Sequence, residues 1–282
     1  MVRQPLFSVI LPTYDRAAFL DEAIDSVLRQ YVADFELIVI DDGGHDRVCV
    51  PDDDRIRLIH LPENLGPAAA RNAGIAAACG RYVTFLDDDD LSTPNRLELA
   101  LEGLERAPIA VCWGRFIDGT ADTGRMLDGD VSASILDEAT PTLGYAALRR
   151  DLVTRFDERW QAVEDVVWWL EVAGRAPVAT VASVGYLVRR HDGPRNRNHL
   201  RARIVENHRL LDELHVFFCS RPRAKAFRLK RIGLMAIAAE DRRSAVSALA
   251  GSWRLHPSVA TTWHVARALI GFGAVGRRRR ST

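Results

Sequence analysis

A short apolar run ends in four consecutive carboxylates at Tyr82-Val83-Thr84-Phe85-Leu86-Asp87-Asp88-Asp89-Asp90. The apolar and β-prone residues at its start predict a buried strand. Four adjacent negative charges repel one another, so they need solvent or a cation beside them. Oxygen ligands at the end of a rigid strand suit a hard divalent ion that also holds phosphate oxygens. Taken alone, the run is equally consistent with a solvated acidic loop or a helix N-terminus before Pro94.

The segments around this run alternate between strand and helix patterns. The first expected strand, 7–11, is apolar almost throughout, as strands buried in parallel sheets are. Apolar residues then recur at helical spacing up to Leu28, and an alanine-rich helix is expected from Pro67. Further strands are expected at 35–40, 56–60, 82–86, 109–116 and 177–188, and further helices at 94–106 and from Trp160. This alternation predicts an α/β fold with a doubly wound, mostly parallel sheet.

Polar residues follow three of the expected strands. They are Tyr14 with Asp15, Asp41 with Asp42, and the run Asp87–Asp90. Ligands bind at the carboxyl ends of the strands in such sheets, so these groups are expected to converge on one crevice. Asp15 is also placed to cap the helix that follows it. Neither a dinucleotide-binding glycine fingerprint nor a P-loop lysine motif is present, so a metal is expected to carry much of the phosphate charge.

Composition restricts the classes of protein that fit. The 282 residues have a formal net charge of zero, which gives no global bias toward nucleic acid. Four scattered cysteines without C-x-x-C spacing argue against a zinc knuckle or a disulfide framework, and they fit a reducing compartment. We see no signal peptide and no apolar run near the roughly 20 residues of a membrane span. A cytoplasmic protein is therefore expected.

The second half of the chain has weaker patterns. Residues 117–140 are expected to be rich in loops, and from about residue 198 the pattern is only helical. Of the adjacent Trp168 and Trp169, at least one is expected in the core, and the other is a candidate wall of an acceptor site. The apolar residues 268–272 and the run Arg277–Arg280 leave two interpretations of the C-terminal end. It is either part of a helical cap on the catalytic domain or a peripheral contact with the inner membrane face.

Five blocks, in order, resemble the family 2 glycosyltransferases. They are Phe7-Ser8-Val9-Ile10-Leu11-Pro12-Thr13-Tyr14, Val39-Ile40-Asp41-Asp42-Gly43, the run 64–74, Phe85–Asp90 with Pro94, and Glu164-Asp165. The resemblance covers about residues 5–195. It implies a GT-A fold, which is a Rossmann-like, mixed and mostly parallel sheet flanked by helices, here with a C-terminal helical extension. The implied domains are 1–197, with a nucleotide-sugar half at 1–116 and an acceptor half at 117–197, and the extension 198–282.

The resemblance also implies the donor contacts. Pro12 and Tyr14 match the turn that binds the nucleotide base, and Asp42 matches the residue that hydrogen-bonds the base. Asp87 matches the first acid of the D-x-D motif, and Asp88 matches a ribose contact. The block after Asp42 departs from the family's usual Gly-Ser-x-Asp, which loosens any inference about the base.

Further matches concern the metal and the chemistry. Asp89 matches the metal ligand, for Mn²⁺ or Mg²⁺, and His191 is either a second metal contact or a loop histidine. Arg71 is expected at the donor crevice, against the donor or paired with one of its acids. Asp165 matches the catalytic base, with Glu164 as the fallback. Arg190, Arg195 and Arg197 are candidate diphosphate contacts in a flexible lid.

The sequence thus predicts a metal-dependent, inverting glycosyltransferase. Its donor is a nucleoside-diphosphate sugar, with uridine or thymidine favoured, and its acceptor is a hydroxyl of a glycan, a lipid-linked molecule or a small molecule. Such a reaction belongs to glycan, polysaccharide or glycoconjugate biosynthesis. One alternative is a sugar nucleotidyltransferase, which would want a lysine-bearing glycine loop in place of Pro12-Thr13-Tyr14-Asp15-Arg16. The other is a catalytically inactive nucleotide-sugar-binding module.

Overall fold

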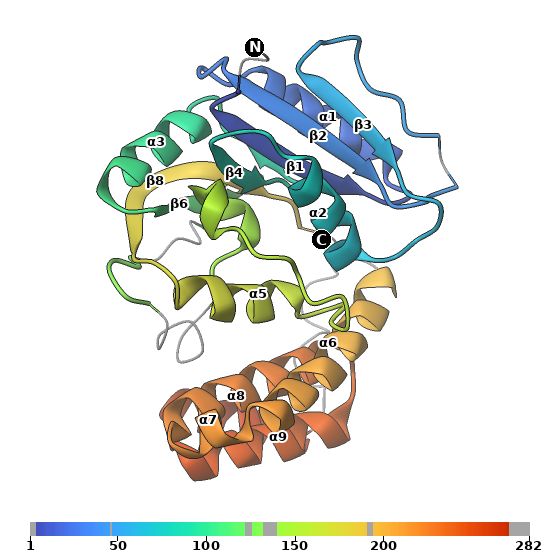
Figure 1. Cartoon of the computed structure of the whole chain (residues 1–282). Coiled ribbons are helices and arrows are strands. Elements are labelled where there is room, and N and C mark those ends of the chain that lie inside the picture. The colour runs from blue at the N-terminus through green and yellow to red at the C-terminus, as the bar shows by residue number, and fades with distance from the viewer. Residues whose placement is uncertain (1–3, 46, 122–125, 132–139, 191–193, 271–282) are drawn as a thin grey trace. The chain divides into compact units, whose positions relative to one another are not determined.

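The computed structural model describes residues 4–45, 47–121, 126–131, 140–190 and 194–270 (Figure 1). The chain divides into two compact units. The first contains Met1–Ile135 and Thr140–Arg190, and the second contains Leu136–Ala139 and His191–Thr282. Among the described residues, no helix combines the length and the apolar character that a membrane crossing requires.

One mixed sheet of eight strands forms the centre of the first unit, in the order β3-β2-β1-β4-β7-β6-β8-β5. Strands β1, β2, β3 and β4 run parallel, whereas β7 runs antiparallel between β4 and β6. The predicted mixed, mostly parallel α/β sheet is therefore confirmed. The strands are β1 (Phe7–Thr13), β2 (Phe35–Asp41), β3 (Ile56–His60), β4 (Tyr82–Phe85), β5 (Leu91–Ser92), β6 (Ile109–Phe116), β7 (Ala146–Arg149) and β8 (Val178–Val188).

Helices cover the sheet, as the patterns predicted. They are α1 (Ala17–Leu28), α2 (Pro67–Ala77), α3 (Arg96–Arg106) and α5 (Glu164–Ala173). Helix α2 packs against β1 at Gly74, where an added Cβ would lie 2.4 Å from Cγ2 of Ile10. A glycine there lets the helix approach the strand closely, which sets the height of α2 above the sheet.

Two predictions about helix starts are corrected. Helix α5 begins at Glu164 and not at Trp160. Asp15 does not cap α1, whose N-cap position is Arg16. The backbone of Asp15 has a left-handed φ of 49°, and its carboxylate instead accepts a hydrogen bond of 2.6 Å from the backbone N–H of His45. Asp15 therefore ties the end of β1 to the loop after β2.

Both tryptophans of α5 lie in the core. Trp168 is 1% exposed and Trp169 is fully buried, so the expectation that one of them walls an acceptor site is wrong. Trp168 stacks on Phe156 at 5.2 Å between ring centroids and meets Phe85 edge-on at 5.7 Å. Adjacent positions on a helix point about 100° apart, and α5 is covered on both of these sides. The aromatic cluster holds α5 beneath the end of β4.

The second unit is helical. Its helices are α6 (Pro194–Glu213), α7 (His215–Cys219), α8 (Pro222–Ala238), α9 (Arg242–Leu255) and α10 (Val259–Ile270). The helical part thus begins at Pro194, slightly before the expected residue 198. Helix α9 is capped by Asp241, whose side chain accepts from the backbone N–H of Ser244 at 3.0 Å. Gly233 of α8 packs on Leu249 of α9, where a Cβ would lie 2.4 Å from Leu249 Cγ.

Candidate active site

The carboxyl ends of β1, β2 and β4 meet at one place. Thr13, at the end of β1, donates from Oγ1 to Oδ2 of Asp88 at 2.8 Å. The backbone N–H of Asp42, just after β2, donates to the carbonyl oxygen of Thr13 at 2.9 Å. The expected convergence of three strand ends is therefore observed, because parallel strands place these ends at the same edge of the sheet.

The acidic cluster, Asp87–Asp90, lies at this edge and is partly buried. Burial raises the pKa of Asp88 to about 6, although the charge of Arg16 opposes that shift. Burial also raises the pKa of Asp90 to about 8, with a further contribution from the charge of Asp87. The arrangement concentrates negative charge in a weakly solvated place, and such a cluster favours a bound cation.

Arg16 is one of the cations that the chain itself supplies to the acidic cluster. Its Nη1 donates to Oδ1 of Asp88 at 3.1 Å and also to Oδ2 of Asp89. Burial lowers the pKa of Arg16, but the charges of Asp89 and Asp88 outweigh this and raise it above its ordinary value. We did not assign Arg16 a role from the sequence. Its position, directly after the Pro12–Asp15 turn, was the only available signal.

Arg189 joins the end of β8 to the same cluster. Its backbone N–H donates to Oδ1 of Asp90 at 2.8 Å, and its Nε donates to the carbonyl oxygen of Asp89 at 3.0 Å. The neighbouring Arg190 is directed elsewhere, with its guanidinium 3.9 Å from the ring centroid of Phe116 and 3.7 Å from Asp118. The candidate role of Arg190 at the diphosphate thus has no support from its position. The side chains of Arg195 and Arg197 and all of His191 lie outside the described residues.

A divalent metal fits the acidic cluster only when another ligand helps to hold it. In the part of the chain that the structure describes, no three His, Cys, Asp or Glu side chains form a metal cage. Mg²⁺ and Mn²⁺ do not need one, because they commonly bind through one or two carboxylates, waters and substrate phosphates. The carboxylates of Asp87 and Asp89, with 34% and 14% of their side chains exposed, offer such a partial ligand set.

Arg71 connects the acidic cluster to the start of α5. Its Nη2 donates to Oδ1 of Asp87 at 2.9 Å, and its Nη1 donates to Oε1 of Glu164 at 2.7 Å. Burial would lower the pKa of Arg71, but the charges of Asp87 and Glu164 raise it above its ordinary value. Arg71 is only 7% exposed, so it acts on its surroundings through these two carboxylates. The structure therefore shows it paired with an acid of the acidic cluster and with Glu164.

The two acids at the start of α5 have different environments. Glu164 is 8% exposed and is held by Arg71, and burial raises its pKa. Asp165 is half-buried, and one of its oxygens accepts from the backbone N–H of Val166 at 2.8 Å. Of the two, Asp165 is the acid whose carboxylate can meet a molecule arriving from solvent.

Asp42 shapes the loop beside the cluster. Its two carboxylate oxygens accept from the backbone N–H groups of Leu65 and Gly66, each at 2.9 Å. Burial raises the pKa of Asp42, and these two hydrogen bonds partly offset that effect. Gly66 has a left-handed φ of 89°, which explains why glycine follows Leu65. Each carboxylate oxygen can accept a second hydrogen bond, so Asp42 retains capacity for a ligand.

The remaining predicted contacts lie at the same end of β1. Tyr14 is 37% exposed directly after the strand, and Pro12 is half-buried within it. Their geometry places them beside the strand ends that carry Asp42 and the acidic cluster. Whether either contacts a nucleotide stays a prediction.

Arg96 is a positioning residue that sequence reasoning missed. It is 3% exposed at the start of α3, and its guanidinium donates to the carbonyl oxygens of Phe85 at 2.6 Å and Gly144 at 2.5 Å. A second nitrogen donates to Oγ of Ser92 at 2.8 Å. These bonds fix the chain on both sides of the acidic cluster. An arginine in the first turn of a helix is usually exposed, so the sequence carried no signal for this role.

Comparison with known proteins shows which family part of this chain is similar to. Residues 8–131 match the family model described as Glycosyl transferase family 2. The chain is 37% identical over 121 residues to an uncharacterized glycosyltransferase of Haemophilus influenzae, across 41% of this chain and 48% of that protein. It is 41% identical over 107 residues to the putative colanic acid biosynthesis glycosyl transferase WcaA of Escherichia coli, across 36% of this chain and 38% of that protein. The matched segments span less than half the length of these relatives.

Solved structures agree on the fold. TarS 1–349 of S. aureus, in complex with UDP-GlcNAc, has a TM-score of 0.60 at 16% identity and covers 93% of this chain and 92% of that chain. The mannosyltransferase PcManGT of Pyrobaculum calidifontis, in complex with GDP-Man and Mn²⁺, has a TM-score of 0.56 at 19% identity and covers 94% and 79%. Residues 8–131 are therefore similar to the family 2 glycosyltransferases, and the chain has the GT-A fold of these solved structures.

Proposed function

We propose that this glycosyltransferase moves a sugar from a nucleoside-diphosphate sugar to an acceptor hydroxyl, with inversion at the anomeric carbon and with Mn²⁺ or Mg²⁺ as cofactor. The observation that carries the proposal is the meeting of three strand ends at the acidic cluster, with Glu164, the neighbour of Asp165 in the chain, linked to that cluster through Arg71. A diphosphate beside these carboxylates requires a bridging cation. The Mn²⁺ in the PcManGT structure supports this cofactor.

The proposed roles divide the reaction between two sides of the cleft. Asp89, with Asp87 beside it, would hold the metal, which when bound stabilises the negative charge of the leaving diphosphate. Asp88 would contact the ribose, while Pro12, Tyr14 and Asp42 would contact the base. Asp165 would take the proton of the acceptor hydroxyl, because an inverting transfer needs a base on the side opposite the leaving group.

The proposed domains follow from this division. Residues 1–197 would form the catalytic domain, with donor contacts in 1–116 and acceptor contacts in 117–197, and 198–282 would be a helical extension. The acceptor would belong to glycan, polysaccharide or glycoconjugate biosynthesis. The similarity to WcaA, a putative colanic acid biosynthesis glycosyl transferase, supports a polysaccharide acceptor. Donor complexes of the structural neighbours, with UDP-GlcNAc and GDP-Man, support a nucleotide-sugar donor.

A thermal-shift screen of nucleoside diphosphates tests the donor. We expect UDP and dTDP, with Mn²⁺, to raise the melting temperature more than ADP does. The reason is that uracil and thymine present an N–H to the carboxylate of Asp42, whereas the corresponding ring nitrogen of adenine is an acceptor. Guanine also presents an N–H, so GDP is expected to bind as well. Strong selectivity for ADP would contradict the proposed base contact. The control is Asp52→Ala, which removes an exposed carboxylate and should give the same shifts as the wild type.

Product analysis separates the proposed transfer from its two alternatives. A glycosyltransferase incubated with donor and metal releases the nucleoside diphosphate slowly even without acceptor, because water takes the place of the acceptor. A sugar nucleotidyltransferase would instead release inorganic pyrophosphate from a nucleoside triphosphate. An inactive binding module would bind the donor without any release. Release of the diphosphate that needs the metal would exclude both alternatives.

We also propose that the protein is cytoplasmic and makes a peripheral contact with an anionic membrane surface through its second unit. Three large apolar side chains of that unit, Trp253, Val259 and Trp263, are 43%, 90% and 55% exposed. Arg267 lies 5.5 Å from the ring centroid of Trp263, which places a positive charge beside an exposed indole. Indoles and arginines together suit the interface of an anionic bilayer. The run Arg277–Arg280 lies outside the described residues.

Vesicle sedimentation tests this contact. We expect the protein to sediment with vesicles that contain anionic lipid and to stay in solution with neutral vesicles. Trp263→Ser should weaken the sedimentation, because it removes apolar area that the interface would bury. Val216→Ser, which changes another exposed apolar residue of the same unit, is the matched control. Equal sedimentation of the two variants and the wild type would contradict a contact at Trp263.

A further inference from the structure

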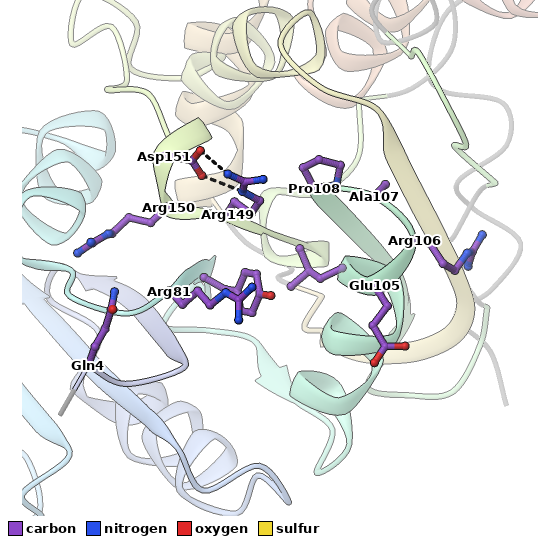
Figure 2. A pocket seen from close by; sticks show the side chains of 11 residues that line it. Gln4, Arg81, Glu105, Arg106, Ala107, Pro108, Arg149, Arg150 and Asp151 are labelled. Atoms are coloured by element: carbon purple, nitrogen blue, oxygen red, sulfur yellow. Dashed lines mark hydrogen bonds and ion pairs between the residues drawn. The ribbon is translucent and has the colours of Figure 1, made fainter.

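An arginine-lined groove opens on the first unit, away from the acidic cluster. It has a volume of about 580 Å³, and its charged rim contains Arg81, Arg106, Arg149 and Arg150 (Figure 2). Arg81 comes directly before β4, and Arg149 is the last residue of the antiparallel β7, so both lie where β4 begins. The acidic cluster lies where β4 ends. The two sites are therefore at opposite edges of the sheet.

The groove is positively charged. Its four arginines face two carboxylates, Glu105 and Asp151, which leaves a formal net charge of +2. Asp151 binds the guanidinium of Arg149 through both oxygens, at 3.0 and 2.7 Å. Arg106 donates to the carbonyl oxygen of Thr180 at 2.9 Å and lies 3.5 Å from Asp128. Two of the four arginines are thus already engaged by carboxylates.

Arg81 and Arg150 differ from the other two. Within the described ranges, neither forms an ion pair with a carboxylate. The guanidinium of Arg81 lies over the ring of Tyr82 at 5.2 Å, and Arg150 donates from Nη1 to the carbonyl oxygen of Ala78 at 3.2 Å. Both residues are exposed. Their remaining N–H donors therefore face solvent, where they can meet an anion.

Backbone hydrogen bonds fix the spacing of these arginines. The N–H of Arg150 donates to the carbonyl oxygen of Arg81 at 3.1 Å, and the N–H of Arg149 donates to that of Pro108 at 3.1 Å. The N–H of Arg81 donates to the carbonyl oxygen of Pro5 at 3.0 Å. These hydrogen bonds fix the backbone segments that carry Arg81, Arg149 and Arg150. A preset spacing lowers the entropy lost when a ligand is bound.

We propose that this groove is a second binding site, for a ligand that carries a phosphate or pyrophosphate group. Guanidinium groups match phosphate oxygens with two parallel hydrogen bonds. The backbones of Arg81 and Arg150 are hydrogen-bonded to each other, and neither side chain pairs with a carboxylate within the described chain. Arg149 would also bind the ligand if its guanidinium exchanged the carboxylate of Asp151 for a phosphate. The ligand is a soluble phosphate compound or a phospholipid headgroup, since both present the same oxygens. The site is separate from the donor site and does not depend on the proposed reaction.

Calorimetry of the full chain tests the groove. The probes are inorganic pyrophosphate and a short-chain, water-soluble phosphatidic acid, each in EDTA at low salt so that no metal supports binding at the acidic cluster. We expect at least one probe to bind the wild type, and Arg81→Ala/Arg150→Ala to weaken that binding at least about tenfold. The matched control is Arg29→Ala/Arg175→Ala, which removes the same charge from exposed arginines that follow α1 and α5. It should bind like the wild type.

The outcomes are distinct. Binding of pyrophosphate alone identifies a soluble ligand, and binding of the phosphatidic acid alone identifies a headgroup. Asp151→Asn should strengthen binding because it frees Arg149, and this arm remains informative if the double variant fails to fold. Absence of binding of both probes to the wild type would overturn the proposal. Equal weakening by the two double variants would do the same, because it would show a general effect of net charge.

Discussion

Asp165→Asn should lower kcat by at least about 10²-fold while leaving donor binding unchanged. The acceptor hydroxyl is a poor nucleophile at neutral pH, so its proton must move to a base as the new bond forms. Asparagine keeps the shape of Asp165 and removes its basicity. The lost interaction belongs to the transition state, so the effect should appear in kcat rather than in the affinity for the donor. Steady-state kinetics together with calorimetric binding of UDP and Mn²⁺ measures both.

Two further variants distinguish the general base from an acid that only stabilises the structure. Glu164→Gln should lower the melting temperature because it weakens a buried ion pair with Arg71, a change worth about 1–3 kcal/mol of stability. Glu171→Gln, an exposed acid on the same helix, should change neither stability nor rate appreciably. Normal turnover in Asp165→Asn would remove it as the base and promote Glu164. Loss of donor binding together with turnover would instead make Asp165 a structural or metal-site residue.

Asp89→Ala should weaken Mn²⁺-dependent binding of UDP by at least about 10²-fold, because losing even an outer-shell partner of a metal ligand costs about 10–100-fold and Asp89 is proposed as a direct ligand. Asp89 shares the Arg16 guanidinium with Asp88, and it is one of the two partly exposed carboxylates of the acidic cluster. The fold should persist, because Arg16 and Thr13 both keep their hydrogen bonds to Asp88. Electron paramagnetic resonance of Mn²⁺, titrated with UDP, reports binding directly.

The control for this variant is Asp52→Ala, which removes an exposed carboxylate of the same size outside the cleft. It should bind Mn²⁺ and UDP as the wild type does. Asp89→Asn adds a graded test, because an amide oxygen can still coordinate a metal but carries no charge. If Asp89→Ala binds UDP with unchanged metal dependence, the proposed metal site is wrong. A large fall in the melting temperature of the metal-free variant would show that Asp89 supports the fold instead.

The strands of the donor side were predictable because their patterns are local. Phe7–Leu11 is nearly all apolar since a parallel strand is covered on both faces, and that composition is visible in one segment. Strand β3 has the predicted bounds, Ile56–His60. In contrast, β7 is four residues long, and β5 has only two. Their pairing partners lie far away in the chain, so no local sequence pattern predicts these two strands.

The residues of the candidate site also divide into those that local sequence predicts and those that only the tertiary structure brings together. The sequence by itself determined that acids follow the ends of several strands, and the parallel sheet then brings Thr13, Asp42 and Asp88 together. Only the tertiary structure decided which cations meet those acids. Arg16 and Arg96 lie at the starts of α1 and α3, whereas Arg71 lies within α2, and each is fixed by contacts with residues distant in sequence. Long arginine side chains carry no periodic pattern, and their partners are chosen by packing and by the cost of burying an unpaired charge.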